Sequence, residues 1–253
     1  MKNKAYNIAT FAIEMFFSII LLILAIMFTV ASIHNIKMTE DIKTFIDCAT
    51  FEQEINGTYY YVVETNDDIE YTININEMTG LSKLGNTGDL FLMPQSRIEV
   101  FPFVAQFISY LFGGHAGIVI DGGKRLVEAM GGTIEQGFVY NEPTDLFTEE
   151  RTVVGMRVNA SMEERGQAAQ NALTLVGAKY NYLYIFNTLN AYYCTDLCHR
   201  VYGKEFGMDY IIDTNWFHVS LQDLFRSDDT YITFVKYKQG DRTYIYYLKN
   251  TNE

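Results

Sequence analysis

The chain has 253 residues and a formal net charge of −12, and it contains 19 Tyr, 18 Phe and only 3 Pro. This composition argues against intrinsic disorder, and the acidic balance argues against a protein that binds nucleic acid through charge. Three cysteines do not make a disulfide framework, because an odd number leaves at least one free thiol.

The N-terminal segment carries nineteen consecutive residues without a charge, from position 15 to position 33. A helix of this length rises about 28 Å, which is close to the thickness of a bilayer core. Two lysines precede the run, so the positive-inside rule places the following domain outside the cytoplasm. We expect residues 1–34 to be a single-pass membrane anchor. The alternatives are a cleavable signal peptide with Ala31 as the cleavage residue, and a buried soluble helix.

Residues 35–84 are expected to connect this anchor to the main domain. The spacing of apolar residues over 34–52 predicts a short helix that leaves the membrane. Two runs rich in Tyr, Val, Ile and Thr follow at 58–64 and 69–75, and residues 66–68 supply a turn. This pattern predicts a β-hairpin made of these two runs.

Residues 85–253 are expected to form one α+β domain, a small antiparallel sheet, closed or strongly bent, with helices packed on it. Ser161 and Glu164 form the sequence pattern of a capping box at the start of a helix. The predicted elements in chain order are a turn into a strand at 85–92, an apolar helix-like stretch at 98–112, a hairpin at 115–120 and 126–130, helices at 161–176 and 194–202, and a closing hairpin at 230–237 and 242–248.

Cys194 begins the helix predicted at 194–202, and this position suits a reactive thiol. A helix N-terminus lowers the pKa of a thiol and presents backbone N–H groups to an oxyanion. A Cys–His hydrolase needs such a thiolate beside an imidazole, with a third group that orients the ring. Taken alone, the position also fits a buried apolar cysteine.

Five short blocks add the histidine and the third group. Each block is weak by itself, but five in this order over about residues 85–205 are a specific signal. The blocks resemble the circularly permuted papain-fold hydrolases of the NlpC/P60 superfamily, in particular the YiiX-like group related to the lecithin–retinol acyltransferases. They are GDLF at 88–91, HAGIVI at 115–120, LVEA at 126–129, GAKYN at 177–181 and YCTDL at 193–197.

The resemblance implies a role for individual residues. Cys194 would be the nucleophile, His115 the general base, and Glu128 the residue that orients the imidazole ring. From their positions next to the nucleophile and in a tyrosine-rich stretch, we also expect Tyr193 and Tyr180 to line the substrate-binding site, with packing in the core as the alternative. The implied fold is a permuted papain-like domain.

The chain departs from this group in three places. An apolar insert separates position 91 from His115, the nucleophile helix also carries Cys198 and His199, and the first 80 residues match nothing in the group. The Cys-x3-Cys spacing lacks the second ligand pair of a zinc site. We therefore expect no metal and no cofactor, and we expect Cys198 to pack in the core.

The expected function is hydrolysis or acyl transfer at an amide or ester through an acyl-enzyme on Cys194. Cell-wall peptide amides are the first expectation for an outward-facing domain, and a lipid amide or ester is the alternative, since related enzymes act on lipids. Two further alternatives are a non-catalytic binding module on the same fold and a structural membrane protein. The expected partners are a peptide or lipid substrate and the membrane, but not nucleic acid.

Overall fold

A computed structural model describes most of the chain. The helix-like stretch expected at 98–112 lies outside the described residues. The described residues are 2–67, 69–70, 73–76, 80–94, 114–123, 125–130, 133–139, 152–182, 184, 190–210 and 218–250.

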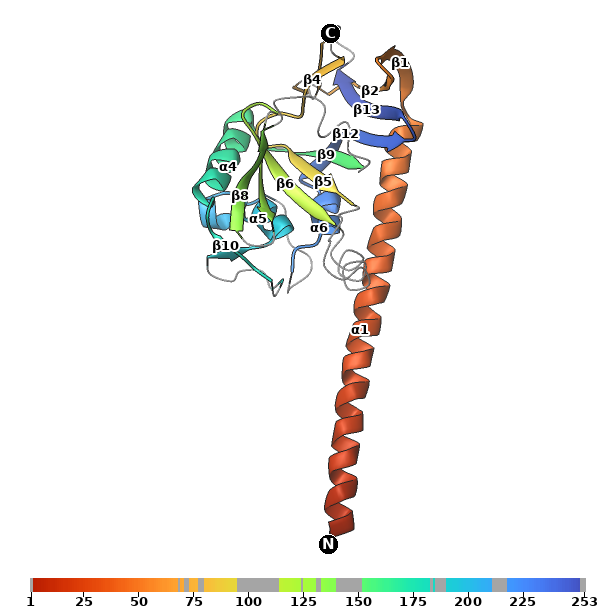
Figure 1. The fold of residues 1–253 in the computed structure, drawn as a ribbon, viewed down its shortest axis with the longest axis vertical. Helices are drawn as coiled ribbons and strands as arrows, with labels where there is room; N and C mark the ends of the chain where they lie inside the picture. Colours follow the sequence, from red (N-terminus) through yellow and green to blue (C-terminus); the bar gives the residue numbers. More distant parts are fainter. Residues whose placement is uncertain are drawn as a thin grey trace.

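One helix, α1 (Lys2–Asp47), forms the N-terminal part of the molecule and extends as a rod far beyond the rest of the protein (Figure 1). Its 46 residues rise about 69 Å. The part Thr10–Asp47 is long and apolar enough to cross a membrane, properties that signal sequences share. The short helix expected at 34–52 is not separate, because α1 continues unbroken to Asp47.

The C-terminal third of α1 packs against the domain along one helical face. Ala31 and Met38 are buried, and Phe45 packs against the same core. Positions separated by three, four or seven residues share one face of a helix, which explains this pattern. On the same side of α1, the Gln222 side-chain amide donates a hydrogen bond of 2.6 Å to Oδ1 of Asn35.

The domain is built on a large, mainly antiparallel sheet with the strand order β1-β2-β13-β12-β9-β5-β6-β7-β8-β10-β11. Among the described strand pairs, β2–β13 and β10–β11 are parallel. The strands are β1 (Thr50–Ile55), β2 (Thr58–Thr65), β5 (Leu90–Met93), β6 (His115–Ile120), β7 (Arg125–Met130), β8 (Thr133–Val139), β9 (Val153–Val158), β10 (Lys179–Tyr180), β11 (Ala191–Tyr192), β12 (Thr230–Gln239) and β13 (Arg242–Asn250). A separate hairpin consists of β3 (Ile73–Asn76) and β4 (Gly80–Leu84).

Two expectations about the sheet are wrong. The sheet is not small, because β1 and β2 extend it on one side through the pairing of β2 with β13. The strand β2 pairs with β1 and β13 and not with 69–75, since β3 pairs with β4. Asn56 and Gly57, both at positive φ, turn the chain between β1 and β2. An Asn-Gly pair is a strong hairpin signal, and it could have identified the correct partner.

The described part of the domain also contains three helices, of which α4 and α5 pack on β6. The two hairpins expected at 115–130 and 230–248 are confirmed as β6–β7 and β12–β13. The capping box of Ser161 and Glu164 is also confirmed, because each side chain bonds the backbone N–H of the other residue. The helices are α4 (Met162–Thr174), α5 (Cys194–Val201) and α6 (Leu221–Arg226), and a short 3₁₀ turn, η1 (Lys204–Phe206), follows α5.

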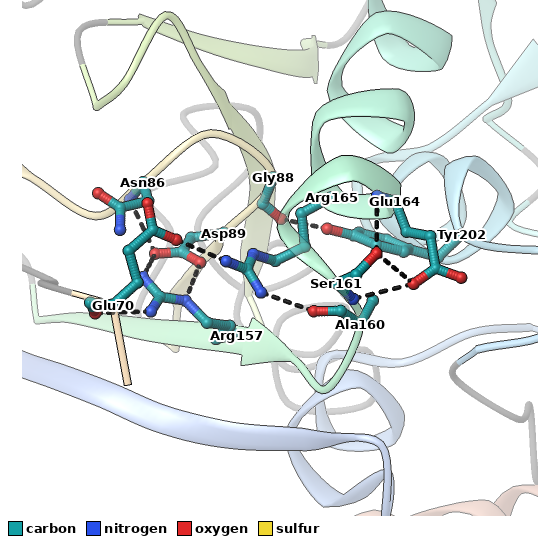
Figure 2. Close-up of polar contacts among 10 residues, drawn as sticks. All are labelled: Glu70, Asn86, Gly88, Asp89, Arg157, Ala160, Ser161, Glu164, Arg165 and Tyr202. Carbon is teal, nitrogen blue, oxygen red and sulfur yellow. Dashed lines mark hydrogen bonds and ion pairs between the residues drawn. The ribbon is translucent and has the colours of Figure 1, made fainter. Parts of the chain in front are cut away.

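A buried ion pair fastens the turn before β5 to β9 (Figure 2). Two guanidinium nitrogens of Arg157 donate to the two carboxylate oxygens of Asp89 at 2.7 and 2.8 Å, and both side chains are at most 1% exposed. Asp89 also accepts the backbone N–H of Asn86. The Tyr202 hydroxyl donates to the carbonyl of Gly88 at 2.6 Å. The C-terminal end of α5 is therefore tied to the same turn.

Candidate active site

Cys194 is the first residue of α5, directly after the extended residue Tyr193. The residue is only 7% exposed. The backbone N–H groups of Thr195 and Ala116 both hydrogen-bond the sulfur. The sulfur therefore sits among the N–H donors of a helix start and of strand β6, which stabilises a thiolate.

His115, the first residue of β6, hydrogen-bonds the Cys194 thiol. Burial lowers the pKa of His115, but the hydrogen bonds and charges of Cys194 and Glu128 outweigh it and raise this pKa to about 10. Burial raises the pKa of Cys194, but the hydrogen bond and charge of His115 outweigh it and lower this pKa. These opposite shifts favour a thiolate–imidazolium pair.

Glu128 lies on β7, with its Oε2 2.6 Å from Nε2 of His115. The residue opposite Glu128 in the sheet is Gly117, two positions after His115 and so on the same face. A Cβ at Gly117 would lie 3.4 Å from the Cβ of Glu128 and 3.3 Å from the carbonyl of Val127. A side chain at position 117 would therefore crowd the backbone beside Glu128. Because Nε2 of His115 faces the carboxylate, its Nδ1 remains for the thiol.

The structure brings together the three residues expected to act as a unit, Cys194, His115 and Glu128. They come from α5, β6 and β7, which lie side by side in the fold. The imidazole is held between the carboxylate and the thiol, as the chemistry of a Cys–His hydrolase requires. The individual catalytic roles stay predictions.

The two tyrosines expected in the substrate site occupy different surroundings. Tyr180 on β10 is half-buried, and burial followed by the charge of Cys194 raises its pKa. Tyr193 is fully buried, and its hydroxyl accepts the backbone N–H of Val219 at 2.6 Å. The hydroxyl of Tyr193 is thus engaged within the fold. A role of either residue in substrate binding stays a prediction.

Val219 is a part of the site that sequence reasoning missed. Its N–H is bound by Tyr193, and its carbonyl accepts a 2.6 Å hydrogen bond from the Thr195 hydroxyl. Tyr193 and Thr195, on either side of Cys194, therefore both form hydrogen bonds with the backbone of the same buried residue, Val219. Val219 precedes Ser220, the cap of α6, which forms a capping box with Asp223. That Ser-x-x-Asp pattern could have predicted α6. It could not have predicted the two hydrogen bonds to Val219, because they join residues that are distant in the sequence.

The second cysteine of α5 has a different environment. Cys198 is fully buried in the core, as expected, and burial raises its pKa well above the ordinary value. Cys48, near the end of α1, is an exposed free thiol. In the part of the chain that the structure describes, no group of three or more His, Cys, Asp and Glu side chains could hold a metal ion.

Comparison with known proteins identifies a protein family that this chain matches. The family model described as "Permuted papain-like amidase enzyme, YaeF/YiiX, C92 family" matches residues 86–242, which is more than half of the chain. Among solved structures, the fold is similar to one described as metalloprotein yiiX from Escherichia coli O157:H7, at 18% identity and a TM-score of 0.45. That similarity covers 60% of this chain and 98% of the other. No curated protein matches the chain.

Proposed function

Because the chain belongs to the permuted papain-like amidase family YaeF/YiiX, C92, we propose that it is a cysteine amidase whose catalytic residues are Cys194, His115 and Glu128. The observation that carries the proposal is the imidazole of His115, which hydrogen-bonds the Cys194 thiol on one side and the Glu128 carboxylate on the other. A binding module needs no such arrangement. Three titratable groups aligned this way are typical of an activated nucleophile.

The reaction starts from the thiolate–imidazolium pair. The sulfur of Cys194 attacks the acyl carbonyl carbon, and the carbonyl electron pair moves to the oxygen. When the tetrahedral intermediate collapses, the carbon–nitrogen or carbon–oxygen bond breaks, and His115 gives its proton to the leaving amine or alcohol. His115 then takes a proton from water, which attacks the thioester and releases a carboxylic acid and the thiol.

Two backbone groups are suited to stabilise the negative oxygen of that intermediate. The N–H of Thr195 lies at the start of α5, and the N–H of Ala116 lies on β6 next to His115. Both already hydrogen-bond the sulfur, so they are close to the place where a carbonyl would sit during attack. Such preorganised donors contribute roughly 3–4 kcal/mol to catalysis in other acyl-transfer enzymes.

We extend the proposal to location and substrate. We propose that α1 anchors the chain in a membrane with the domain outside the cytoplasm, and that the wider kinship is with the NlpC/P60 hydrolases. Cell-wall peptide amides are the substrates expected from an outward-facing domain, and lipid amides or esters are the alternative. The chemistry of Cys194 is the same for both, since both present an acyl carbonyl.

Acylation of the full chain by p-nitrophenyl acetate in detergent tests the catalytic part of the proposal. We expect one acetyl group on Cys194, detected by mass spectrometry of peptides, and release of p-nitrophenol that the Cys194→Ala variant lacks. A Cys48→Ala variant is the matched control and should react like the original chain. Acetylation that persists in Cys194→Ala at the original rate would reject the proposal.

A further inference from the structure

The anchor helix and the domain are joined without a linker. The uncharged run of α1 ends at residue 33, but Ala31, inside that run, is already buried. Asn35, which accepts the hydrogen bond from Gln222, lies two residues after the run, a rise of only about 3 Å. If residues 15–33 span a bilayer, the domain therefore starts at the membrane surface.

A short series of contacts leads from this part of α1 to the nucleophile. Gln222 belongs to α6, which packs on α1. Three residues earlier, Val219 is held by Tyr193 and Thr195, the neighbours of Cys194 on either side. The start of α5 is thus positioned through α6 on the part of the anchor helix that leaves the apolar run.

The arrangement of the domain agrees with these contacts. In Figure 1, α6 and β10 lie at the end of the domain that faces the N-terminal half of α1, whereas β4 and the C-terminus lie at the opposite end. Strand β11 pairs with β10 and ends two residues before Cys194. The nucleophile is therefore at the end of the domain that faces the apolar part of the helix.

An exposed aromatic side chain marks the same end. Tyr182 follows β10, is 63% exposed, and has its ring centroid 4.9 Å from that of Tyr180. Tyrosine is enriched at membrane–water interfaces, because its ring suits the apolar side and its hydroxyl suits the headgroup side. An exposed tyrosine beside the site is consistent with an interface at this level.

We propose that Cys194 acts on a bilayer-resident amphiphile, a molecule held in the membrane by an acyl chain with its amide or ester carbonyl at the headgroup level. This inference rests on the proposed function and selects the lipid class of substrate over soluble cell-wall peptides. The domain takes the substrate directly from the leaflet into which α1 is inserted. Attack on the carbonyl forms the acyl–sulfur bond, His115 protonates the amine or alcohol that leaves, and water releases the fatty acid.

The test changes only the height of the domain above the bilayer. The full chain is reconstituted in phosphatidylcholine vesicles with a fluorogenic palmitoyl anilide, and p-nitrophenyl acetate serves as the soluble substrate. A lifted variant carries an 18-residue helical insert of Ala, Glu and Lys between Ile33 and His34, directly after the span. Five whole turns raise the domain by about 27 Å and keep the docking face in register. The matched control carries the same insert between Ala9 and Thr10, before the span.

We expect the lifted variant to lose at least tenfold in anilide hydrolysis, while the control and the original chain agree. All three should react equally with p-nitrophenyl acetate. Equal anilide hydrolysis by the lifted variant and the original chain would overturn the inference, as would an original chain that cleaves soluble peptide amides but not the anilide. An original chain that p-nitrophenyl acetate does not acylate would instead reject the proposed function.

A second variant covers the case in which the insert disturbs the docking of α1. Tyr182→Glu places a charge at the proposed interface without touching the core, since this side chain is exposed. We expect anilide hydrolysis to fall at least threefold while p-nitrophenyl acetate reacts as before. Unchanged anilide hydrolysis in Tyr182→Glu would contradict the membrane-facing arrangement independently of the insert.

Discussion

The carboxylate of Glu128 and the imidazole of His115 lie 2.6 Å apart across two antiparallel strands, although thirteen positions separate them in the chain. Glu128 is almost fully buried, and it faces the ring from the neighbouring strand β7. A buried carboxylate is costly unless a partner compensates its charge, and the imidazolium is that partner. The pair therefore links the stability of the fold to the protonation of the proposed catalytic base.

The first prediction concerns Glu128→Gln, which keeps the shape of the side chain and removes its charge. We expect the kcat of the amidase reaction to fall at least about tenfold, because His115 acts as a general acid and base, a role worth about 10²–10⁴-fold. The alkaline limb of the kcat/KM profile should move to lower pH, because Glu128 helps to raise the pKa of His115. The double variant with Cys194→Ala should be no slower than Cys194→Ala alone. Near-full activity of a folded Glu128→Gln protein would remove Glu128 from the site.

The second prediction concerns thiol reactivity. Near neutral pH, we expect iodoacetamide to modify Cys194 well before Cys198 and Cys48, because His115 and the backbone N–H donors lower the pKa of Cys194. Burial keeps Cys198 protonated and inaccessible. Peptide mass spectrometry over a time course measures the three rates. In His115→Ala, modification of Cys194 should slow while Cys48 is unaffected, and equal rates for all three thiols in the original chain would argue against activation.

The third prediction links pH to stability. The pKa of His115 is raised to about 10 in the folded protein, so its protonation stabilises the fold fully below the ordinary value of about 6.5. This contribution is lost as the pH rises towards 10. We expect His115→Gln to lower the urea midpoint of the full chain in detergent strongly at pH 6 and weakly at pH 10. If the difference in urea midpoint between His115→Gln and the original chain were the same at pH 6 and pH 10, the raised pKa of His115 would be contradicted.

The fourth prediction concerns the hydrogen bond from the Thr195 hydroxyl to the Val219 carbonyl. Thr195→Val removes the donor to the Val219 carbonyl and leaves a buried acceptor without its hydrogen bond, which costs about 1–3 kcal/mol of unfolding free energy. The start of α5 should also lose its exact placement, so we expect kcat to fall more than KM rises. Thr195→Ser keeps the hydroxyl and should recover most of both losses. Urea unfolding and steady-state kinetics measure the two effects, and a Thr195→Val protein identical to the original chain would exclude the positioning role.

The fifth prediction concerns topology. Protease added to intact cells should digest the domain from residue 58 onward and spare the extreme N-terminus, because α1 would span the membrane with the domain outside. Immunoblots with tags at either end of the chain distinguish the fragments. Complete protection of the domain until the cells are lysed would place it in the cytoplasm and remove cell-wall substrates from consideration.

Local patterns were sufficient for much of the fold. The run HAGIVI and the turn after it determine the β6–β7 hairpin, and Ser161 with Glu164 determines the start of α4. The position of Cys194 before an apolar periodic run predicted the start of α5. In each case the physical cause lies within a few residues, as backbone sterics, capping or the alternation of a strand. The order of the five motif blocks then indicated which residues should meet.

Only the tertiary structure decided the long-range partners. The parallel pairing of β2 with β13 joins segments almost at opposite ends of the chain, and nothing near either strand specifies it. The same holds for Val219, whose backbone bonds the side chains of Tyr193 and Thr195, and for Gln222, which donates to Asn35 of α1. The apolar side of a strand or helix can pack against any apolar surface of suitable shape. Which partner it takes therefore depends on the packing of the whole core. Sequence by itself determined the chemistry of the proposed site, whereas its orientation towards α1 was decided by the packing of α6 on that helix.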